Sequence, residues 1–522
     1  MSPFVSCPDV AALLSSSGLF ALFDVRERGE YNNGQIPGAT SLPRSQIEFR
    51  IAELVPNRKI RIVVYDEGGE RAALAAQTLA ECGYHSVSVL EGGLDEWQKQ
   101  GRPTVSGVNV PSKAFGEKVY QERRIPEITP EELRSLRETA ADLLILDMRT
   151  PEEYARFCIP GGLNVPGGDV VLWAAELRRK PGRTVVVNCA GRTRSIIGAA
   201  GFRRLGLNNV RALRNGTMGW LLAGFELESK PRTKSLVASA PSRQNGRALA
   251  LRLAAEEGIP GIAASELKRI GGTEDEGVTY LVDVRSESEF ESGHLPGSLN
   301  IPGGQAVQRA DDFIAVRNAE IVFISNQSAR AVMAAYWYRQ MGFPDVWFLR
   351  DGLAGWRRDG GSMATGKKGR EPLGLEEAKN SVRLVTPSEA QDLLKRSSVV
   401  ALDVGSSAEY EAAHLPGAKW LSRGWLEIKL PGFIPELTQG ILLSCPEGEQ
   451  SLFAASALAE CGYREVSVLA GGVKAWRDAG LPTVSGLTAC LTDANDIVLS
   501  PSITGNQDDM RRYLEWEKRL PH

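Results

Sequence analysis

The sequence predicts an α/β protein made of four tandem copies of one unit, each a mainly parallel sheet flanked by helices. An apolar run that ends in aspartate recurs four times, and a tryptophan follows each aspartate by 73 residues, giving the pairs Asp24 and Trp97, Asp147 and Trp220, Asp283 and Trp356, and Asp403 and Trp476. β-rich runs alternate with helical stretches between these landmarks, which is typical of a parallel sheet covered on both faces. A spacing kept without net insertion in four copies indicates one shared fold, because loops usually drift in length.

The first copy illustrates the order of elements that we expect in each unit. A buried strand ends at Asp24, and the Pro37-Gly38 pair that follows predicts a turn. A second β-rich run, Arg61–Tyr65, precedes a helical stretch, and a third run, Val87–Leu90, precedes a glycine-containing turn that leads to the tryptophan. Three strands separated by a turn and a helix are therefore expected in every copy.

The repeat sets the expected domain boundaries. We expect four domains and a C-terminal tail, at residues 1–107, 123–232, 258–362, 382–486 and 487–522. The Gly-, Ser-, Lys- and Arg-rich linkers near 105–122, 233–257 and 361–382 are expected to be flexible, with a short helix over Ala248–Ala255 as the alternative for the second. In the tail, acids at Asp508-Asp509 and bases near Lys518 predict a helix that either packs across the domains or stays mobile.

The composition excludes several classes of function. The 522 residues carry 61 basic and 64 acidic side chains, so no long-range field draws the chain to nucleic acid or to a membrane. No basic and apolar leader opens the sequence and no run approaches about 18 apolar residues, which predicts a cytoplasmic protein. The seven cysteines form no C-x-x-C pair, so neither a disulfide framework, nor a metal site, nor a cofactor is expected.

The residue after the second strand is the expected place for chemistry. It stands 42 residues after the strand-ending aspartate in every copy, as Asp66, Cys189, Ser325 and Cys445. In parallel sheets, catalytic groups gather where strands end and helices begin. The four copies can therefore be compared at one position.

The motifs together resemble the rhodanese family: Asp-x-Arg, then Pro-Gly, then a Cys-headed loop of six residues, then a glycine turn before tryptophan. The resemblance covers nearly the whole chain as four tandem domains. It implies a transfer in two steps, in which a thiolate takes sulfane sulfur from an anionic donor and passes it to a nucleophilic acceptor. Such a loop wraps backbone N–H groups around the sulfur at a helix N-terminus, and nearby arginines strengthen it.

Only the second loop looks competent, and Cys189 is the expected nucleophile. Its loop continues with Ala190, Gly191, Arg192, Thr193 and Arg194, which are the expected substrate-binding residues, and no acid lies among them. The four histidines, at 85, 294, 414 and 522, are all outside this domain. A Cys–His couple is therefore not expected, and the helix dipole and the arginines are left to stabilise the thiolate.

The other loops depart from this pattern. Asp66 cannot carry a persulfide, and the hydroxyl of Ser325 has no evident local base, so the first and third domains are expected to be silent. Cys445 is followed by Glu447 and Glu449, which should raise the pKa of the thiol and repel an anionic donor. The fourth domain is thus expected to be weak or inactive, with Cys445 as a secondary thiol that could receive sulfur from Cys189 or serve as a redox-sensitive thiol.

Asp147 and Arg149 have two interpretations. They either fix a strand end as a salt bridge or help to shape the catalytic loop.

The expected reaction is transfer of sulfur from thiosulfate to cyanide or a thiol. The alternative is a persulfide carrier or docking module that delivers sulfur to a partner protein. A mercaptopyruvate sulfurtransferase is disfavoured because the loop differs from Cys-Gly-[Ser/Thr]-Gly-Val-Thr. A cysteine phosphatase uses Cys-x5-Arg, whereas Cys189 and Arg194 give Cys-x4-Arg. The physiological donor and acceptor, and any pairing of the domains, stay open.

Overall fold

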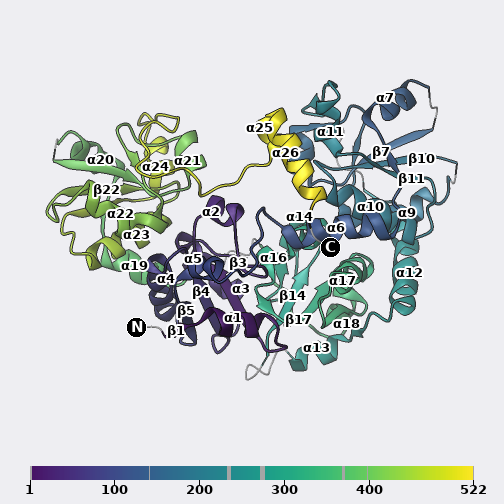
Figure 1. Cartoon of the computed structure of the whole chain (residues 1–522), viewed down its shortest axis with the longest axis horizontal. Helices are drawn as coiled ribbons and strands as arrows, with labels where there is room; N and C mark the ends of the chain where they lie inside the picture. The colour runs from purple at the N-terminus through teal and green to yellow at the C-terminus, as the bar shows by residue number, and fades with distance from the viewer. Residues whose placement is uncertain are drawn as a thin grey trace. The chain divides into compact units, whose positions relative to one another are not determined.

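Four parallel sheets of the same topology form the protein. The computed structural model describes residues 3–139, 142–180, 182–231, 237–270, 277–366, 371–396 and 398–520. Each sheet has its strand-ending aspartate on an inner strand, and the orders are β1-β5-β4-β2-β3, β6-β11-β10-β7-β9, β13-β18-β17-β14-β15 and β19-β23-β22-β20-β21 (Figure 1). The predicted α/β class and the parallel sheets are confirmed.

The strands match the β-rich runs of the sequence. Their bounds in domains 1 and 2 are β1 Phe4–Val5, β2 Phe20–Asp24, β3 Thr40–Ser41, β4 Arg61–Tyr65, β5 Val87–Leu90, β6 Glu127–Ile128, β7 Leu143–Asp147, β8 Phe157–Cys158, β9 Leu163–Asn164, β10 Thr184–Asn188, β11 Val210–Leu213 and β12 Glu228–Ser229. Those in domains 3 and 4 are β13 Gly261–Ile262, β14 Thr279–Asp283, β15 Leu299–Asn300, β16 Val316–Arg317, β17 Glu320–Ile324, β18 Val346–Leu349, β19 Arg383–Val385, β20 Val399–Asp403, β21 Lys419–Trp420, β22 Gly440–Ser444 and β23 Val466–Leu469. In domain 2, β8 and β12 form a separate antiparallel pair.

Helices follow the strands in the predicted alternation. Those of domains 1 and 2 are α1 Cys7–Leu14, α2 Arg28–Asn33, α3 Ile47–Leu54, α4 Glu70–Glu81, α5 Gly93–Lys99, α6 Val110–Glu122, α7 Pro130–Thr139, α8 Pro151–Arg156, α9 Val170–Leu177, α10 Thr193–Arg204 and α11 Gly216–Leu222. Those of domains 3 and 4 and the tail are α12 Ala240–Glu256, α13 Ala264–Ile270, α14 Glu287–Glu291, α15 Gly303–Gln308, α16 Ala310–Phe313, α17 Ala329–Gln340, α18 Gly352–Arg358, α19 Leu375–Ser381, α20 Pro387–Leu394, α21 Ser407–Ala412, α22 Leu426–Phe433, α23 Glu449–Glu460, α24 Gly472–Asp478, α25 Pro501–Thr504 and α26 Gln507–Lys518. Among the residues that the structure describes, no helix is long and apolar enough to cross a bilayer.

Two of the expected linkers are largely helical. The region 105–122 contains α6, which packs on α10, and 233–257 contains α12, which packs on α9 and α17. The expectation of a flexible linker is therefore wrong for α6, whereas the alternative of a helix over Ala248–Ala255 is confirmed for the second linker by the longer α12. Each of these helices buries apolar side chains, such as Phe115 and Leu253, against its neighbours. The predicted tail helix is confirmed as α26, which lies beside α6 (Figure 1).

The chain divides into two units with nested sequences. Unit 1 joins residues 1–108 to 370–498, so that domain 1 pairs with domain 4, and unit 2 joins residues 109–369 to 499–522, so that domain 2 pairs with domain 3. Each unit therefore contains two domains, and unit 2 also contains the tail.

The pairing in unit 1 is quasi-symmetric. Arg44 and Arg423 stand at equivalent places, 20 residues after their strand-ending aspartates. Arg423 donates to the carboxylate of Glu48, with a shortest distance of 2.5 Å, and Arg44 pairs in the same way with Glu427. Domains 1 and 4 thus contact each other through equivalent surfaces, as the two subunits of an isologous dimer do.

We expect Arg423→Ala to destabilise unit 1 by about 3–5 kcal/mol, because it leaves the buried Glu48 carboxylate without its cation. Urea denaturation of the full chain measures the loss. Lys395→Ala, which removes an exposed ion pair with Asp392, is the control and should leave the stability nearly unchanged, because water screens this pair. A loss for Arg423→Ala as small as that of the control would contradict a structural role for the pair.

Domains 2 and 3 of unit 2 approach through the same region of the repeat. Gly167-Gly168 and Gly303-Gly304 occupy equivalent positions, and a Cβ on Gly168 would lie 3.1 Å from the Cα of Gly303. Glycine is needed there because the two backbones nearly touch.

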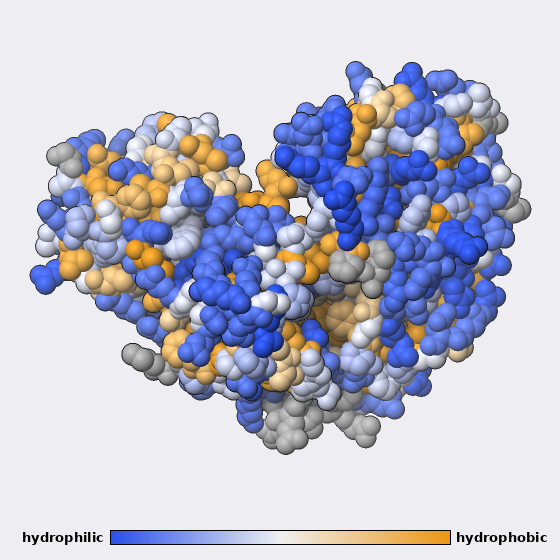
Figure 2. Space-filling model, viewed as in Figure 1, coloured by the Kyte–Doolittle hydropathy of each residue, from blue (hydrophilic) through white to orange (hydrophobic). Residues whose placement is uncertain are grey.

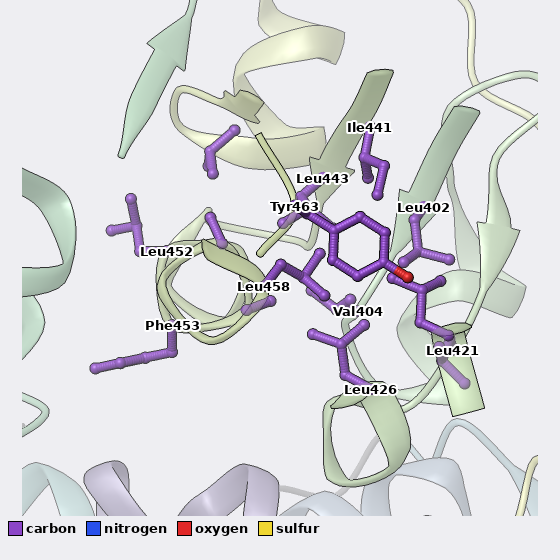
Figure 3. Packing of buried hydrophobic residues seen from close by; sticks show 14 of the residues in the cluster. Leu402, Val404, Leu421, Leu426, Ile441, Leu443, Leu452, Phe453, Leu458 and Tyr463 are labelled. Carbon is purple, nitrogen blue, oxygen red and sulfur yellow. The ribbon is translucent and has the colours of Figure 1, made fainter. Parts of the chain in front are cut away.

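Each sheet packs its helices over an apolar core, and domain 4 shows the arrangement. Leu402 and Leu443 of adjacent strands face Leu426 of α22 and Leu458 of α23 (Figure 3). Leu402, Leu426, Leu443 and Leu458 are fully buried. This packing holds the carboxyl end of β22, and with it the loop that follows, in a fixed place.

Candidate active site

Cys189 lies where the sequence places it, at the carboxyl end of β10 and ahead of α10. Its side chain is buried, with 2% of the residue exposed. The thiol lies 3.6 Å from the hydroxyl of Ser195, which itself donates to the carbonyl of Arg192 at 2.8 Å. The loop therefore curls back so that its first turn of helix faces the sulfur.

The other three loops adopt a related curl around different side chains. The backbone N–H six residues further on donates to the side chain at the nucleophile position, from Ala72 to Asp66 at 3.1 Å, from Ala331 to Ser325 at 3.3 Å and from Ser451 to Cys445 at 3.4 Å. The scaffold is thus common to all four domains. What differs is the chemistry of the side chain that it holds.

A glycine turn at the start of α11 packs against the backbone of the Cys189 loop and holds it in place. Gly216 begins α11 with φ +55°, and a Cβ at this position would lie 2.2 Å from the carbonyl oxygen of Cys189. The N–H groups of Thr217 and Met218 donate to the carbonyls of Cys189 and Ala190 at 2.8 and 3.0 Å. Only glycine allows this approach, so the turn and the loop form one rigid unit.

Arg194 is an ion-pair partner rather than an open cation. Its guanidinium grips both oxygens of Glu153 on α8, at 2.6 and 2.8 Å. The equivalent pairs recur in domains expected to be silent, as Arg71 with Glu30 and Arg330 with Glu289. The last residue of the loop is therefore part of the scaffold and does not by itself mark an active domain.

Arg192 is also committed to acids. It donates to Glu117 of α6 at 2.5 and 2.9 Å and to Glu127 of β6 at 3.2 Å, and it is 4% exposed. The loop itself holds no acid, as the sequence shows, but the fold brings three carboxylates to its two arginines, Glu117 and Glu127 to Arg192 and Glu153 to Arg194. The sequence did not indicate these ion pairs.

Burial raises the pKa of the Cys189 thiol above its usual value, and the positive charge of Arg194 and hydrogen bonds with Ser195 oppose the rise. The sequence predicted a stabilised thiolate. In the described conformation the low dielectric around the sulfur outweighs the arginine, so the neutral thiol is favoured.

Thr193 and Gly191 face the tail. The Thr193 hydroxyl donates to Oε1 of Glu517 on α26 at 2.5 Å. A Cβ on Gly191 would meet Met218, Glu517 and Tyr513 within 3.6 Å. Neither contact was predicted, because Thr193 and Glu517 lie 324 residues apart.

Asp147 and Arg149 form a buried ion pair of 2.7 Å, which confirms the salt-bridge interpretation. Arg149 also donates to the carbonyl of Phe157 at 2.6 Å, and Asn188 donates to Asp147 at 3.1 Å. Asp147 thereby ties β7 to the last residue of β10, one position before Cys189. The same ion pair occurs in domains 1 and 3.

Domain 4 has lost this arginine. Gly405 stands in its place, and burial raises the pKa of Asp403 to about 7. Cys445 is buried beside it, and burial raises the pKa of this thiol to about 11, with Asp403 adding to the rise. The predicted rise in the pKa of Cys445 is confirmed. Its largest cause is burial, whereas the sequence pointed to the charges of Glu447 and Glu449.

Domain 4 should lose stability as the pH rises from about 4 to 7. The folded state binds the Asp403 proton more tightly than the unfolded chain does. Protonated Asp403 therefore contributes fully to the free energy of unfolding below its ordinary pKa. This contribution, up to about 4 kcal/mol, is lost as the pH rises through about 7. Hydrogen exchange in β20 of wild type and Asp403→Asn at each pH measures it. The difference between the two proteins should grow with pH, and a constant difference would contradict a buried, protonated Asp403.

The fold and the site together define a family. A profile described as "Rhodanese-like domain" matches residues 7–100, 129–223, 263–359 and 386–479. The chain belongs to the rhodanese-like family, with four such domains.

A solved structure matches this chain over nearly its full length, and curated relatives match parts of it. A crystal structure of a thiosulfate sulfurtransferase from Pseudomonas aeruginosa superposes with a TM-score of 0.91 at 36% identity, covering 99% of this chain and 97% of that one. A thiosulfate sulfurtransferase of Azotobacter vinelandii is 30% identical over 218 residues, 37% of this chain and 79% of its own length. Human thiosulfate:glutathione sulfurtransferase is 32% identical over 108 residues, 18% of this chain and 93% of its own length.

Proposed function

We propose that the protein is a sulfurtransferase that moves sulfane sulfur from an anionic donor, with thiosulfate as the expected one, to cyanide or a thiol. The observation that carries this proposal is the position of Cys189. Of four equivalent loops on one scaffold, its loop alone joins a thiol to the intact Asp-x-Arg pair, Asp147 and Arg149. The full-length likeness to a thiosulfate sulfurtransferase supports the choice of donor.

The reaction balances without a cofactor. The Cys189 thiolate attacks the outer sulfur of thiosulfate, the sulfur–sulfur bond breaks, and sulfite leaves with the electron pair. An acceptor such as cyanide then attacks the outer sulfur of the persulfide, and the Cys189 thiolate departs as thiocyanate forms. The ordered loop and its Gly216 brace hold the sulfur in place during both displacements.

The thiolate must form although burial raises its pKa. We expect the Cys189 thiol to lose its proton to water when the site opens. The positive charge of Arg194 then stabilises a thiolate that is better solvated than in the described conformation. We therefore expect the rate of the first displacement to rise with pH up to the pKa of Cys189.

Intact mass spectrometry tests the function. After incubation with thiosulfate and removal of excess donor, the chain should carry one added sulfur, and cyanide should then remove it with release of thiocyanate. Folded protein that gains no sulfur from thiosulfate or from other sulfane donors would overturn the proposal.

A persulfide carrier is the second candidate. Its support is the burial of Cys189 and the presence of three further domains that could dock a protein acceptor. A stable persulfide that neither cyanide nor small thiols discharge would favour this function over an enzyme of small molecules.

A further inference from the structure

The C-terminal helix α26 forms a wall of the Cys189 site. Met510 and Leu514 on one face of α26 are buried and cluster with Met218 of α11, the residue whose N–H braces the catalytic loop. The opposite face carries exposed charged residues, and the surface over α26 is hydrophilic in Figure 2. The helix therefore docks through its apolar face and belongs to the folded structure of unit 2.

Glu517 points from this wall at the catalytic loop. The residue is 1% exposed, and its Oε1 accepts the hydrogen bond of Thr193. Its Oε2 has no hydrogen-bond partner among the described residues and lies 3.3 Å from the place where a Cβ on Gly191 would stand. The carboxylate is close enough to the sulfur to add to the rise in the pKa of Cys189.

The charges around Glu517 do not satisfy this oxygen by a hydrogen bond. Arg192 is held by Glu117 and Glu127, and Arg194 by Glu153. The positive charge of Lys113 on α6 also acts on Glu517, and its ammonium group lies over the rings of Tyr513 and Trp516 at 4.8 and 4.7 Å. A buried carboxylate oxygen without a hydrogen-bond donor destabilises the folded protein. A ligand with an N–H donor could supply the missing hydrogen bond to Oε2 and would bind more tightly for that reason.

We infer that Glu517 is a specificity-determining residue of the Cys189 site and selects a sulfur acceptor that carries an ammonium group beside its thiol. The inference rests on the proposed persulfide at Cys189. The ammonium group of such an aminothiol donates to Oε2, while its thiol faces the loop beside Gly191. A thiol that carries a carboxylate is repelled by the same oxygen.

The transfer step balances with water as the proton acceptor. The aminothiol loses its thiol proton to water, and its thiolate attacks the outer sulfur of the Cys189 persulfide. The sulfur–sulfur bond breaks, Cys189 leaves as a thiolate, and the aminothiol departs as a persulfide. Burial raises the pKa of Glu517, and the positive charge of Lys113 opposes the rise. The ammonium group of the bound acceptor favours the ionised carboxylate further, and Glu517 acts by holding this acceptor.

Three small thiols that share the HS–CH2–CH2 group and differ in charge test the inference: cysteamine, 2-mercaptoethanol and 3-mercaptopropionate. The protein is loaded with thiosulfate and freed of donor, and single-turnover rates of discharge are measured and divided by the thiolate concentration of each acceptor. Wild type should discharge to cysteamine at least about tenfold faster than to 3-mercaptopropionate, since a charge-assisted hydrogen bond contributes about 10- to 100-fold. Glu517→Gln should reduce this ratio by at least about tenfold.

Glu515→Gln is the matched control. Glu515 lies on the same helix, exposed and paired with Lys518, and its replacement should leave the ratio within about twofold of wild type. If Glu517→Gln fails to fold, the ratio in wild type still decides, because a ratio near one contradicts the inference. Equal acceleration of all three acceptors in Glu517→Gln would also contradict it, since the carboxylate would then act as a lid. Absence of any persulfide after loading overturns the proposed function instead.

Discussion

Cys189→Ser is expected to abolish both the added sulfur and turnover, by at least about a thousandfold, because the hydroxyl cannot carry a sulfane sulfur and is a far weaker nucleophile. The measurement is mass-spectrometric localisation of sulfur after exposure to thiosulfate, together with the rate of thiocyanate release. The substitution is nearly isosteric, so the fold should persist.

Cys445→Ser is the matched control for this prediction. It alters the equivalent position of domain 4, where burial raises the pKa of the thiol to about 11. We expect it to leave the added sulfur and the turnover within about twofold of wild type, since so little thiolate forms there. Loss of labelling in Cys445→Ser, with Cys189→Ser still labelled, would move the active site to domain 4.

Gly216→Ala is expected to lower turnover by about 100-fold or more. The new Cβ would lie 2.2 Å from the carbonyl of Cys189, so the loop or α11 must move apart by roughly 1 Å, which is enough to misplace a nucleophile. The positive φ adds strain of about 1–3 kcal/mol to the folded state. The rate of persulfide formation at saturating thiosulfate measures the effect.

Gly352→Ala provides the comparison. Gly352 has φ +57°, and its Cβ would lie 2.1 Å from the carbonyl of Ser325, so the two substitutions strain the same feature in two domains. Both should lower thermal stability to a similar extent, whereas only Gly216→Ala should lower turnover. Equal loss of turnover in both variants would mean that global destabilisation, and not the position of Cys189, explains the effect.

The repeat spacing predicted most of the fold for a physical reason. Buried strands need continuous apolar runs, and turns need proline or glycine, so β4 and β5 begin and end at the predicted residues. The constant distance from Asp147 to Cys189 then placed the nucleophile at a strand end. These features are local, and each repeat carries them in full.

The surroundings of Cys189 could not be predicted in the same way. Lys113 and Glu117 lie in a stretch whose composition indicated a linker, and Glu517 comes from the far end of the chain. One signal was available: Glu153 and Arg194 are 41 residues apart, and domains 1 and 3, which we expect to be silent, repeat this spacing. Repetition in copies without a thiol at the nucleophile position would have identified Arg194 as a scaffold residue.

The nested division of the chain has a consequence for its synthesis. Domain 1 leaves the ribosome before domain 4, and the part of domain 4 that covers its Arg44 and Glu48 follows only after residues 109–369 have emerged. Until then these charged groups, buried in the folded protein, stay in water, and unit 1 remains incomplete. Unit 2 is completed later than unit 1, because α26, which carries Glu517, follows domain 4 in the chain.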